Sequence, residues 1–162
     1  MKTEIIKRTE WVSSLRTLSS DELISITTRL SDSWEIKAKS LPQSGLGMIK
    51  LNDSAFNEPF YLGEFPVATA WLEVITSDGQ QAEGAAQIMD DRVELVEALA
   101  LCDAILSSKL KGWEQVDAML KNGFKNKEQL SLERKRILAH TRVDFSLLDE
   151  VGDDTGDVNV ES

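Results

Sequence analysis

The feature that most constrains this chain is a tight turn between two segments of strand-like sequence. Residues 76–79 read Thr-Ser-Asp-Gly, and an Asp-Gly pair tolerates the positive φ angles that a short β-hairpin turn requires. The segments on either side, residues 67–75 and 80–89, have strand length and therefore predict two antiparallel strands. We expect an antiparallel sheet at the centre of the chain.

Upstream of this hairpin the apolar residues also follow the two-residue period of a strand. Trp34, Ile36 and Ala38 alternate with Glu and Lys residues, so one side of the segment is apolar and the other is charged. This pattern predicts a half-exposed strand over residues 34–39.

Further extended segments follow at residues 46–51 and 60–65. The stretch at 42–45 contains Pro, Ser and Gly, which predicts a loose hairpin connection between the first two strands. Pro66 separates residues 60–65 from the next strand, and it fits a strand start, an edge or a bulge because proline donates no ladder hydrogen bond. The whole pattern predicts a meander of about four to five strands.

The first thirty residues favour two helices. Apolar residues recur at near-helical spacing over residues 3–18, which predicts an amphipathic helix. Ser19 followed by Glu22 forms a capping box, in which each side chain satisfies a free amide at a helix start. The apolar stripe of the short second helix comprises Leu23, Ile26 and Leu30.

The segment after the meander is helical with breaks. Asp90 and Asp91 fit the cap and first turn of a helix, where carboxylates meet free amides, and this helix is expected to run through about residue 108. An Asn-Gly pair at 122–123 predicts the end of the next helix. A second, highly charged helix is expected over residues 130–141.

This order of elements predicts the α+β fold class. We expect two N-terminal helices, the antiparallel meander, and C-terminal helices packed on one sheet face. Residues 1–148 are expected to form a single domain. Residues 149–162 form an acidic tail without a basic residue, and we expect this tail to be disordered when the chain is alone.

The charge balance argues against binding to nucleic acid or to an anionic membrane. The chain of 162 residues has 18 Lys and Arg against 28 Asp and Glu, a formal net charge of −10, and such partners require concentrated positive charge. No apolar run reaches the roughly 18 residues of a membrane-spanning helix. Charged residues interrupt the N-terminal segment where a signal peptide would be apolar, so we expect a cytoplasmic protein with no membrane partner.

Few residues are suited to catalysis or metal binding. Cys102 and His140 are the only Cys and His, so the chain alone completes no Cys/His zinc site. Phosphate-binding glycine motifs and the common hydrolase motifs are absent from the sequence. We interpret Cys102 as a packing residue, His140 as a helix C-terminal group, and Asp90 and Asp91 as capping groups. No catalytic, cofactor-binding or metal-binding residue is therefore predicted.

Two places are candidate partner-interface sites. Trp11 lies on the first predicted helix, and Arg142, Val143, Asp144 and Phe145 alternate charged with apolar side chains after the last one. Arg and aromatic residues are enriched in protein interfaces. The alternative for the second segment is a closing strand or helix terminus with Phe145 in the core.

Several short segments, taken in order, carry a resemblance to a known family. They are Leu62-Gly63-Glu64, Glu73-Val74, Asp78-Gly79, Glu83-Gly84, the run from Ala98 to Ala104, and Thr141-Arg142-Val143-Asp144-Phe145. The family that they resemble is PhnG, the G subunit of the bacterial carbon-phosphorus lyase core complex, and the similarity extends from about residue 11 to residue 152.

The resemblance implies an accessory subunit with PhnH-, PhnI- and PhnJ-like partners and associated PhnL- and PhnK-like ATPases. In that family the G, H and L subunits act with the I subunit, which displaces adenine from MgATP with methylphosphonate to give α-D-ribose 1-methylphosphonate 5-triphosphate. The iron-sulfur cluster and S-adenosylmethionine belong to the J subunit, so no cofactor is expected on this chain. The family serves organophosphonate catabolism under phosphate starvation.

Two other functions remain open from the residues alone. The first is a stand-alone small hydrolase or transferase that uses Asp90, Asp91 or His140 in a cleft, and it predicts turnover by the isolated chain. The second is a regulatory module that binds signalling proteins.

Overall fold

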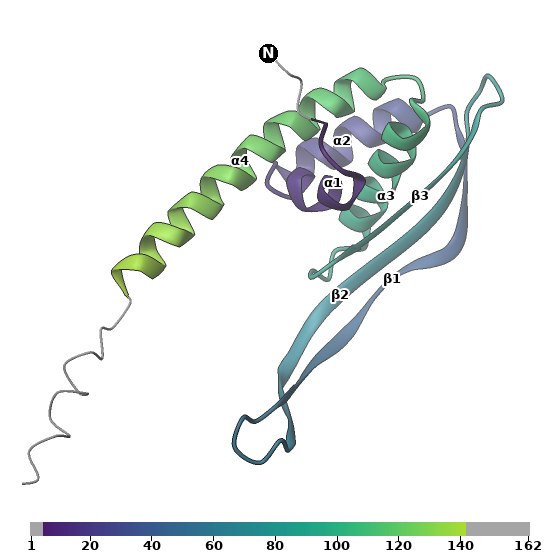
Figure 1. Ribbon diagram of the computed structural model, residues 1–162. Helices are drawn as coiled ribbons and strands as arrows, with labels where there is room; N and C mark the ends of the chain where they lie inside the picture. Colours follow the sequence, from purple (N-terminus) through teal and green to yellow (C-terminus); the bar gives the residue numbers. More distant parts are fainter. Residues whose placement is uncertain (1–4, 142–162) are drawn as a thin grey trace, which may run out of the picture. The chain divides into compact units, whose positions relative to one another are not determined.

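The computed structural model describes residues 5–141. Its elements are α1 (Arg8–Leu15), α2 (Ser20–Ser31), β1 (Glu35–Asn52), β2 (Pro59–Ile75), β3 (Gln81–Ile88), α3 (Val93–Ser108) and α4 (Trp113–His140) (Figure 1). The α+β class is confirmed. The chain divides into two units, residues 1–128 and 129–162, and the first contains the sheet and its covering helices.

The sheet has three antiparallel strands in the order β1-β2-β3, so the expected four to five strands are too many. The tight turn at residues 76–79 joins β2 to β3, as predicted, with Ile75 paired to Gln81. Strands β1 and β2 are each one long element where the sequence predicts two. They pair with each other from Glu35 and Ile75 to Asn52 and Pro59.

The prolines lie within the paired strands and do not turn the chain, which explains the miscount. Pro42 lies in β1 at a shift of register between Ser40 and Gln43, and β1 is an edge strand that tolerates such an irregularity. Pro66 lies in the part of β2 that has β1 as its sole strand neighbour, since β3 pairs with β2 from Ala68 onward.

Helix α3 covers one face of the sheet and forms the core with it. Alternate residues of β2 and β3 are buried against α3, and α3 itself is buried over most of its length. Gly84 makes this close contact possible, because a Cβ at this position would lie 2.5 Å from the Ala104 amide nitrogen. The buried strand residues are Ala68, Ala70, Leu72, Val74, Ala82, Ala86 and Ile88.

The helix starts differ in detail from the capping predictions. Ser19 is the N-cap of α2, as expected, but its side chain makes no capping hydrogen bond. The N-cap of α3 is Arg92, one residue after the predicted aspartates. The first helix begins at Arg8 and ends at Leu15, within the predicted range of 3–18.

The predicted break at residues 122–123 is wrong, because α4 continues through it. Gly123 is buried, and a Cβ there would come within 2.9 Å of the Ser14 carbonyl carbon. Its carbonyl oxygen accepts a hydrogen bond from Thr17 Oγ1 at 2.9 Å. Glycine is required at this position because α4 packs closely on the backbone of α1. It does not end the helix.

Two predictions concern residues outside the described range. Arg142, Val143, Asp144 and Phe145 lie there, as does the acidic tail at residues 149–162. Within residues 5–141, none of the helices has the length and apolar character needed to cross a membrane.

Candidate protein-interaction surface

Among the residues that the sequence singles out for chemistry, Cys102 and Asp90 have structural roles. Cys102 is fully buried in the core cluster, and this burial raises the pKa of its thiol to about 12. The packing role predicted for Cys102 is confirmed. His140 is the exposed last residue of α4.

Asp90 organises the turn before α3. Its carboxylate accepts hydrogen bonds from Arg92 Nε at 2.9 Å and Arg92 Nη2 at 2.8 Å, and from Arg16 Nη2 at 3.2 Å. The Arg92 hydrogen bonds are the main reason that the pKa of Asp90 lies well below its usual value. Asp91 is exposed beside it. Within residues 5–141, no three His, Cys, Asp or Glu side chains gather at metal-binding distance.

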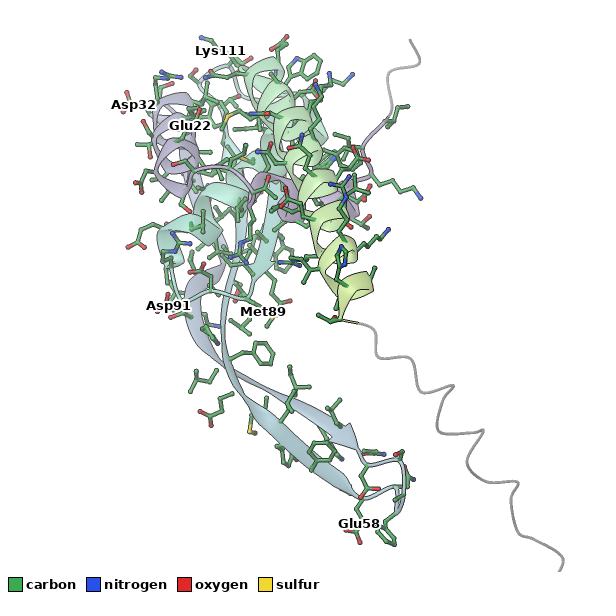
Figure 2. All side chains as sticks on the ribbon, turned by 90° about the vertical axis from the view of Figure 1, so that its left-hand side faces the viewer. Glu22, Asp32, Glu58, Met89, Asp91 and Lys111 are labelled. Carbon is green, nitrogen blue, oxygen red and sulfur yellow. The ribbon has the colours of Figure 1, made fainter. Side chains whose placement is uncertain are left out.

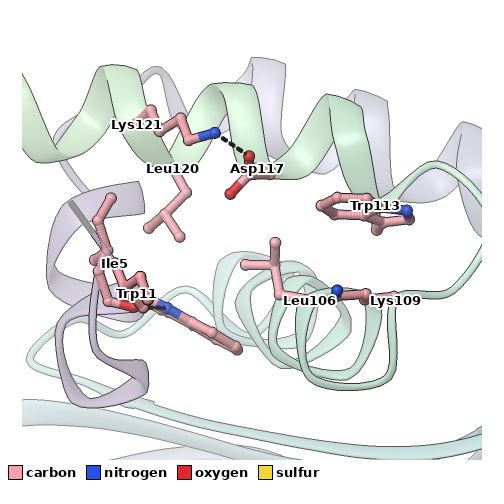
Figure 3. A pocket seen from close by; sticks show the side chains of 9 residues that line it. Ile5, Trp11, Leu106, Lys109, Trp113, Asp117, Leu120 and Lys121 are labelled. Atoms are coloured by element: carbon pink, nitrogen blue, oxygen red, sulfur yellow. Dashed lines mark hydrogen bonds and ion pairs between the residues drawn. The ribbon is translucent and has the colours of Figure 1, made fainter. Parts of the chain in front are cut away.

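Trp11 is half-buried against the core of its own chain. Its indole Nε1 donates a hydrogen bond to the Ile6 carbonyl at 3.1 Å. The ring forms one wall of a hollow of about 260 Å³, which Leu106, Trp113 and Leu120 also line (Figure 3). A role for Trp11 at a partner interface stays a prediction.

Exposed apolar side chains gather where β1 and β2 extend beyond the end of β3 (Figure 1). We call residues 45–67 the arm. Eight of the seventeen exposed large hydrophobic residues in the described part of the chain belong to it. They are Leu46, Met48, Ile49, Leu51, Phe56, Phe60, Tyr61 and Leu62. Clustered apolar side chains exposed to water mark an interaction site, whereas single ones scattered over the surface need no explanation.

Hydrogen bonds order the tip of the arm. One carboxylate oxygen of Asp53 accepts the amide hydrogens of Ala55 and Phe56, at 2.8 and 2.6 Å. The Asp53 amide in turn donates to the Glu58 carbonyl at 3.0 Å. Figure 2 shows Glu58 at the far end of the arm. The loop therefore holds the two strands together at their ends.

Gly63 introduces a bulge on β2. The partner of Ile49 is Gly63, whereas the next residue of β1 pairs with Tyr61, so Leu62 is the extra residue. Gly63 has φ of 151°, a conformation that favours glycine. This bulge explains the glycine in the Leu62-Gly63-Glu64 segment that supports the family resemblance, because glycine permits the bulge that exposes Leu62.

Phe65 and Gly47 pack on each other near the start of the arm. A Cβ on Gly47 would lie 2.8 Å from Phe65 Cζ, so the ring lies directly over the glycine. Because Phe65 is thereby half-covered, it contributes to the rigidity of the arm more than to its exposed surface.

Trp71 lies on the sheet face away from α3, since it alternates with the buried Ala70 and Leu72. Trp71 is 46% exposed, and its indole Nε1 donates to Glu83 Oε2 at 3.2 Å. Lys39 Nζ lies 3.0 Å from the same carboxylate, and this hydrogen bond lowers the pKa of Glu83. These polar contacts orient Trp71 at the sheet surface.

The last part of α4 is a further exposed segment. Every residue from 129 to 141 is exposed, and three consecutive basic residues, Arg134, Lys135 and Arg136, lie within it. Its exposed large hydrophobics are Leu130, Leu132, Ile137 and Leu138. This segment joins apolar with cationic side chains, whereas the arm joins apolar with acidic ones.

Sequence reasoning missed the arm because it divided β1 and β2 into two strands each, and therefore predicted separate strands where these two continue together beyond β3. A signal was available: both extended segments, 46–51 and 60–65, carry apolar residues at adjacent positions. A strand with one buried face alternates instead. Adjacent apolar residues indicate apolar side chains on both faces.

The sequence matches the protein family described as phosphonate metabolism protein PhnG over residues 6–149. A search of the curated proteins found no match. The matched region includes all the helices and strands from α1 to α4, the arm among them. The chain therefore belongs to the PhnG family of phosphonate metabolism proteins.

Proposed function

We propose that this chain is an accessory, non-catalytic subunit of a carbon-phosphorus lyase core complex in the cytoplasm. It assembles with PhnH-, PhnI- and PhnJ-like subunits, and PhnL- and PhnK-like ATPases associate with the complex. With the H, I and L subunits it supports the reaction of MgATP with methylphosphonate that gives α-D-ribose 1-methylphosphonate 5-triphosphate. The nucleotide chemistry belongs to the I subunit, and the iron-sulfur cluster with S-adenosylmethionine belongs to the J subunit.

The arm is the observation that supports a subunit role. Its apolar side chains stay in water when the chain is alone, and their burial in a partner is favourable by about 25 cal/mol per Å² of apolar surface. A hairpin with two strands is marginally stable on its own, so a partner that covers it also stabilises it. Membership in a phosphonate metabolism family indicates that this partner acts in the same metabolism.

Co-expression with the PhnH-, PhnI- and PhnJ-like proteins, followed by size-exclusion chromatography, tests the proposal. We expect the chain to elute with them in one complex of fixed stoichiometry. Elution of the chain as a separate species at micromolar concentration would contradict the proposal.

Adenine release distinguishes an accessory subunit from a stand-alone enzyme. We expect the purified chain to release no adenine from MgATP and methylphosphonate. The full set of subunits, with PhnL present, is expected to release adenine, and omission of this chain is expected to abolish the release. Adenine release by the chain alone would instead support the stand-alone transferase.

A further inference from the structure

We propose that the arm inserts into an apolar groove of a larger partner protein, which covers both faces of the arm and presents Lys or Arg side chains to Glu58 and Glu64. This inference rests on the proposed subunit function and specifies how the partner recognises the chain.

Apolar side chains project from both faces of the arm. Successive residues of a strand point to opposite faces, so Leu46 and Met48 lie on one face and Ile49 and Leu51 on the other. The first two are 71% and 60% exposed, and the second two are 38% and 41% exposed. A flat partner surface covers one face and leaves the other in water. A groove covers both.

Cross-strand pairing extends each face across the width of the arm. Leu51 pairs with Phe60, which is 44% exposed, so these two side chains form a continuous apolar strip. Tyr61 pairs with Lys50 on the face of Leu46 and Met48, and it is 62% exposed. Each face therefore offers an aromatic ring and aliphatic side chains, the residue types that anchor protein interfaces.

The β2 edge of the arm is poorly suited to the addition of another strand. Pro59 and Pro66 both lie in the part of β2 that β3 leaves uncovered, and a proline has no amide hydrogen to donate. Because these prolines interrupt the row of donors on β2, we assign recognition to the faces of the arm.

The charges of the arm favour a cationic partner. Lys50 is its one basic residue, against Asp53, Glu58 and Glu64. The loop already uses the Asp53 carboxylate. Among the ion pairs of residues 5–141, none involves Glu58 or Glu64. Two arms brought together would juxtapose like charges, so a second copy of this chain is a poorer fit than a different protein with basic residues.

Paired substitutions on the two faces test the groove. The first variant is Leu46→Ser with Met48→Ser, and the second is Ile49→Ser with Leu51→Ser. Leu132→Ser is the control, because Leu132 is 57% exposed and lies outside the arm. Affinity is measured by surface plasmon resonance against the immobilised complex of the other core subunits. Circular dichroism of each free variant verifies that its secondary structure is unchanged.

We expect each paired variant to raise the dissociation constant at least tenfold and the control to change it less than twofold. An effect from one face alone would overturn the groove in favour of a flat contact. No effect from either face would overturn the arm as the docking element. If the unaltered chain shows no binding, the proposed subunit function itself fails, which is a separate outcome.

Charge reversal tests the cationic groups of the partner. Glu58→Lys with Glu64→Lys is expected to lower the association rate constant at least tenfold at low salt, with a smaller difference at high salt. An unchanged rate constant would contradict the cationic contacts. Light scattering of the free chain tests whether the arm binds a second copy of this chain instead. A dimer that both face variants abolish would contradict the proposed partner and show that the arm binds another copy.

Discussion

Asp103 shows how a buried charge joins three elements of the fold. Its carboxylate accepts two hydrogen bonds from Arg8, at 2.8 and 2.6 Å, and one from the Ala85 amide at 3.0 Å. The Asp103 side chain is 7% exposed, whereas Arg8 is 58% exposed. Solvent therefore screens the charge of Arg8, and the hydrogen bonds of the pair contribute more to stability than the attraction between the two charges.

Replacement of Asp103 by Asn should destabilise the chain through these hydrogen bonds. We expect a loss of about 1.5–3 kcal/mol in the free energy of unfolding, the range for hydrogen bonds to charged groups. Asp117→Asn is the matched control, because its partly exposed pair with Lys121, four residues along the same helix, is worth about 0.3–0.5 kcal/mol. Urea unfolding followed by Trp fluorescence measures both, and equal losses would contradict the structural role of Asp103.

Cys102 should react with thiol reagents once the chain unfolds, and hardly at all before. Burial removes the thiol from solvent and raises its pKa to about 12, so almost no thiolate exists at pH 8. Labelling with iodoacetamide at pH 8, in the absence of urea and in about 8 M urea, compares the reactivity of the thiol in the folded and unfolded chain. Rapid labelling of the folded chain would show that Cys102 is accessible.

Asp90 should make stability depend on acid pH. Its pKa in the folded chain lies below the unfolded value of about 3.9, chiefly because Arg92 donates hydrogen bonds to the carboxylate. This contribution is complete above the unfolded pKa and is lost as the pH falls below it. We expect Asp90→Asn to be less stable than the unaltered chain at pH 7, and the difference to shrink toward pH 2.

Chemical denaturation at a series of pH values tests this, with the exposed neighbour Asp91→Asn as the control. A difference between Asp90→Asn and the unaltered chain that stays constant from pH 7 to strongly acidic conditions would rule out the carboxylate charge as its source.

At the scale of elements, the arm depends on a glycine that no side chain surrounds. Nothing lies within 4 Å of a Cβ built at Gly63 or at Gly45, yet Gly63 alone of the two has a positive φ, 151°. Gly63→Ala should therefore strain the bulge by about 1–3 kcal/mol, whereas Gly45→Ala should be nearly neutral. Hydrogen exchange of the arm amides is expected to accelerate in Gly63→Ala. Equal exchange in both variants would contradict the role of the bulge.

Local sequence signals predicted the elements well where tertiary packing agrees with them. The turn at residues 76–79, the N-cap position of Ser19 and the end of α3 at Ser108 follow from such signals. The Gly at 123 and the Pro at 42 gave wrong predictions, because packing against Ser14 and pairing with β2 decide those positions. Neither contact is visible from neighbouring residues in the sequence.

At the scale of the whole molecule, the sequence and the structure draw attention to different candidate surfaces. The scarcity of Cys and His, together with the acidic composition, favours a partner-binding role over catalysis. The sequence interpretation placed the interface at Trp11 and at residues 142–145, whereas the structure adds the arm. The arm is exposed because the pairing of β3 with β2 stops at Ala68, and strand patterns in the sequence do not predict where that pairing stops.

Hydrogen-deuterium exchange of the chain, free and within the complex of the other core subunits, tests the central claim most directly. We predict that the amides of residues 45–67 exchange at least tenfold more slowly in the complex, while the amides of the buried helix α3 change little. The same exchange rate for the arm in both states, within a complex that does contain the chain, would contradict the claim that the arm is its docking element.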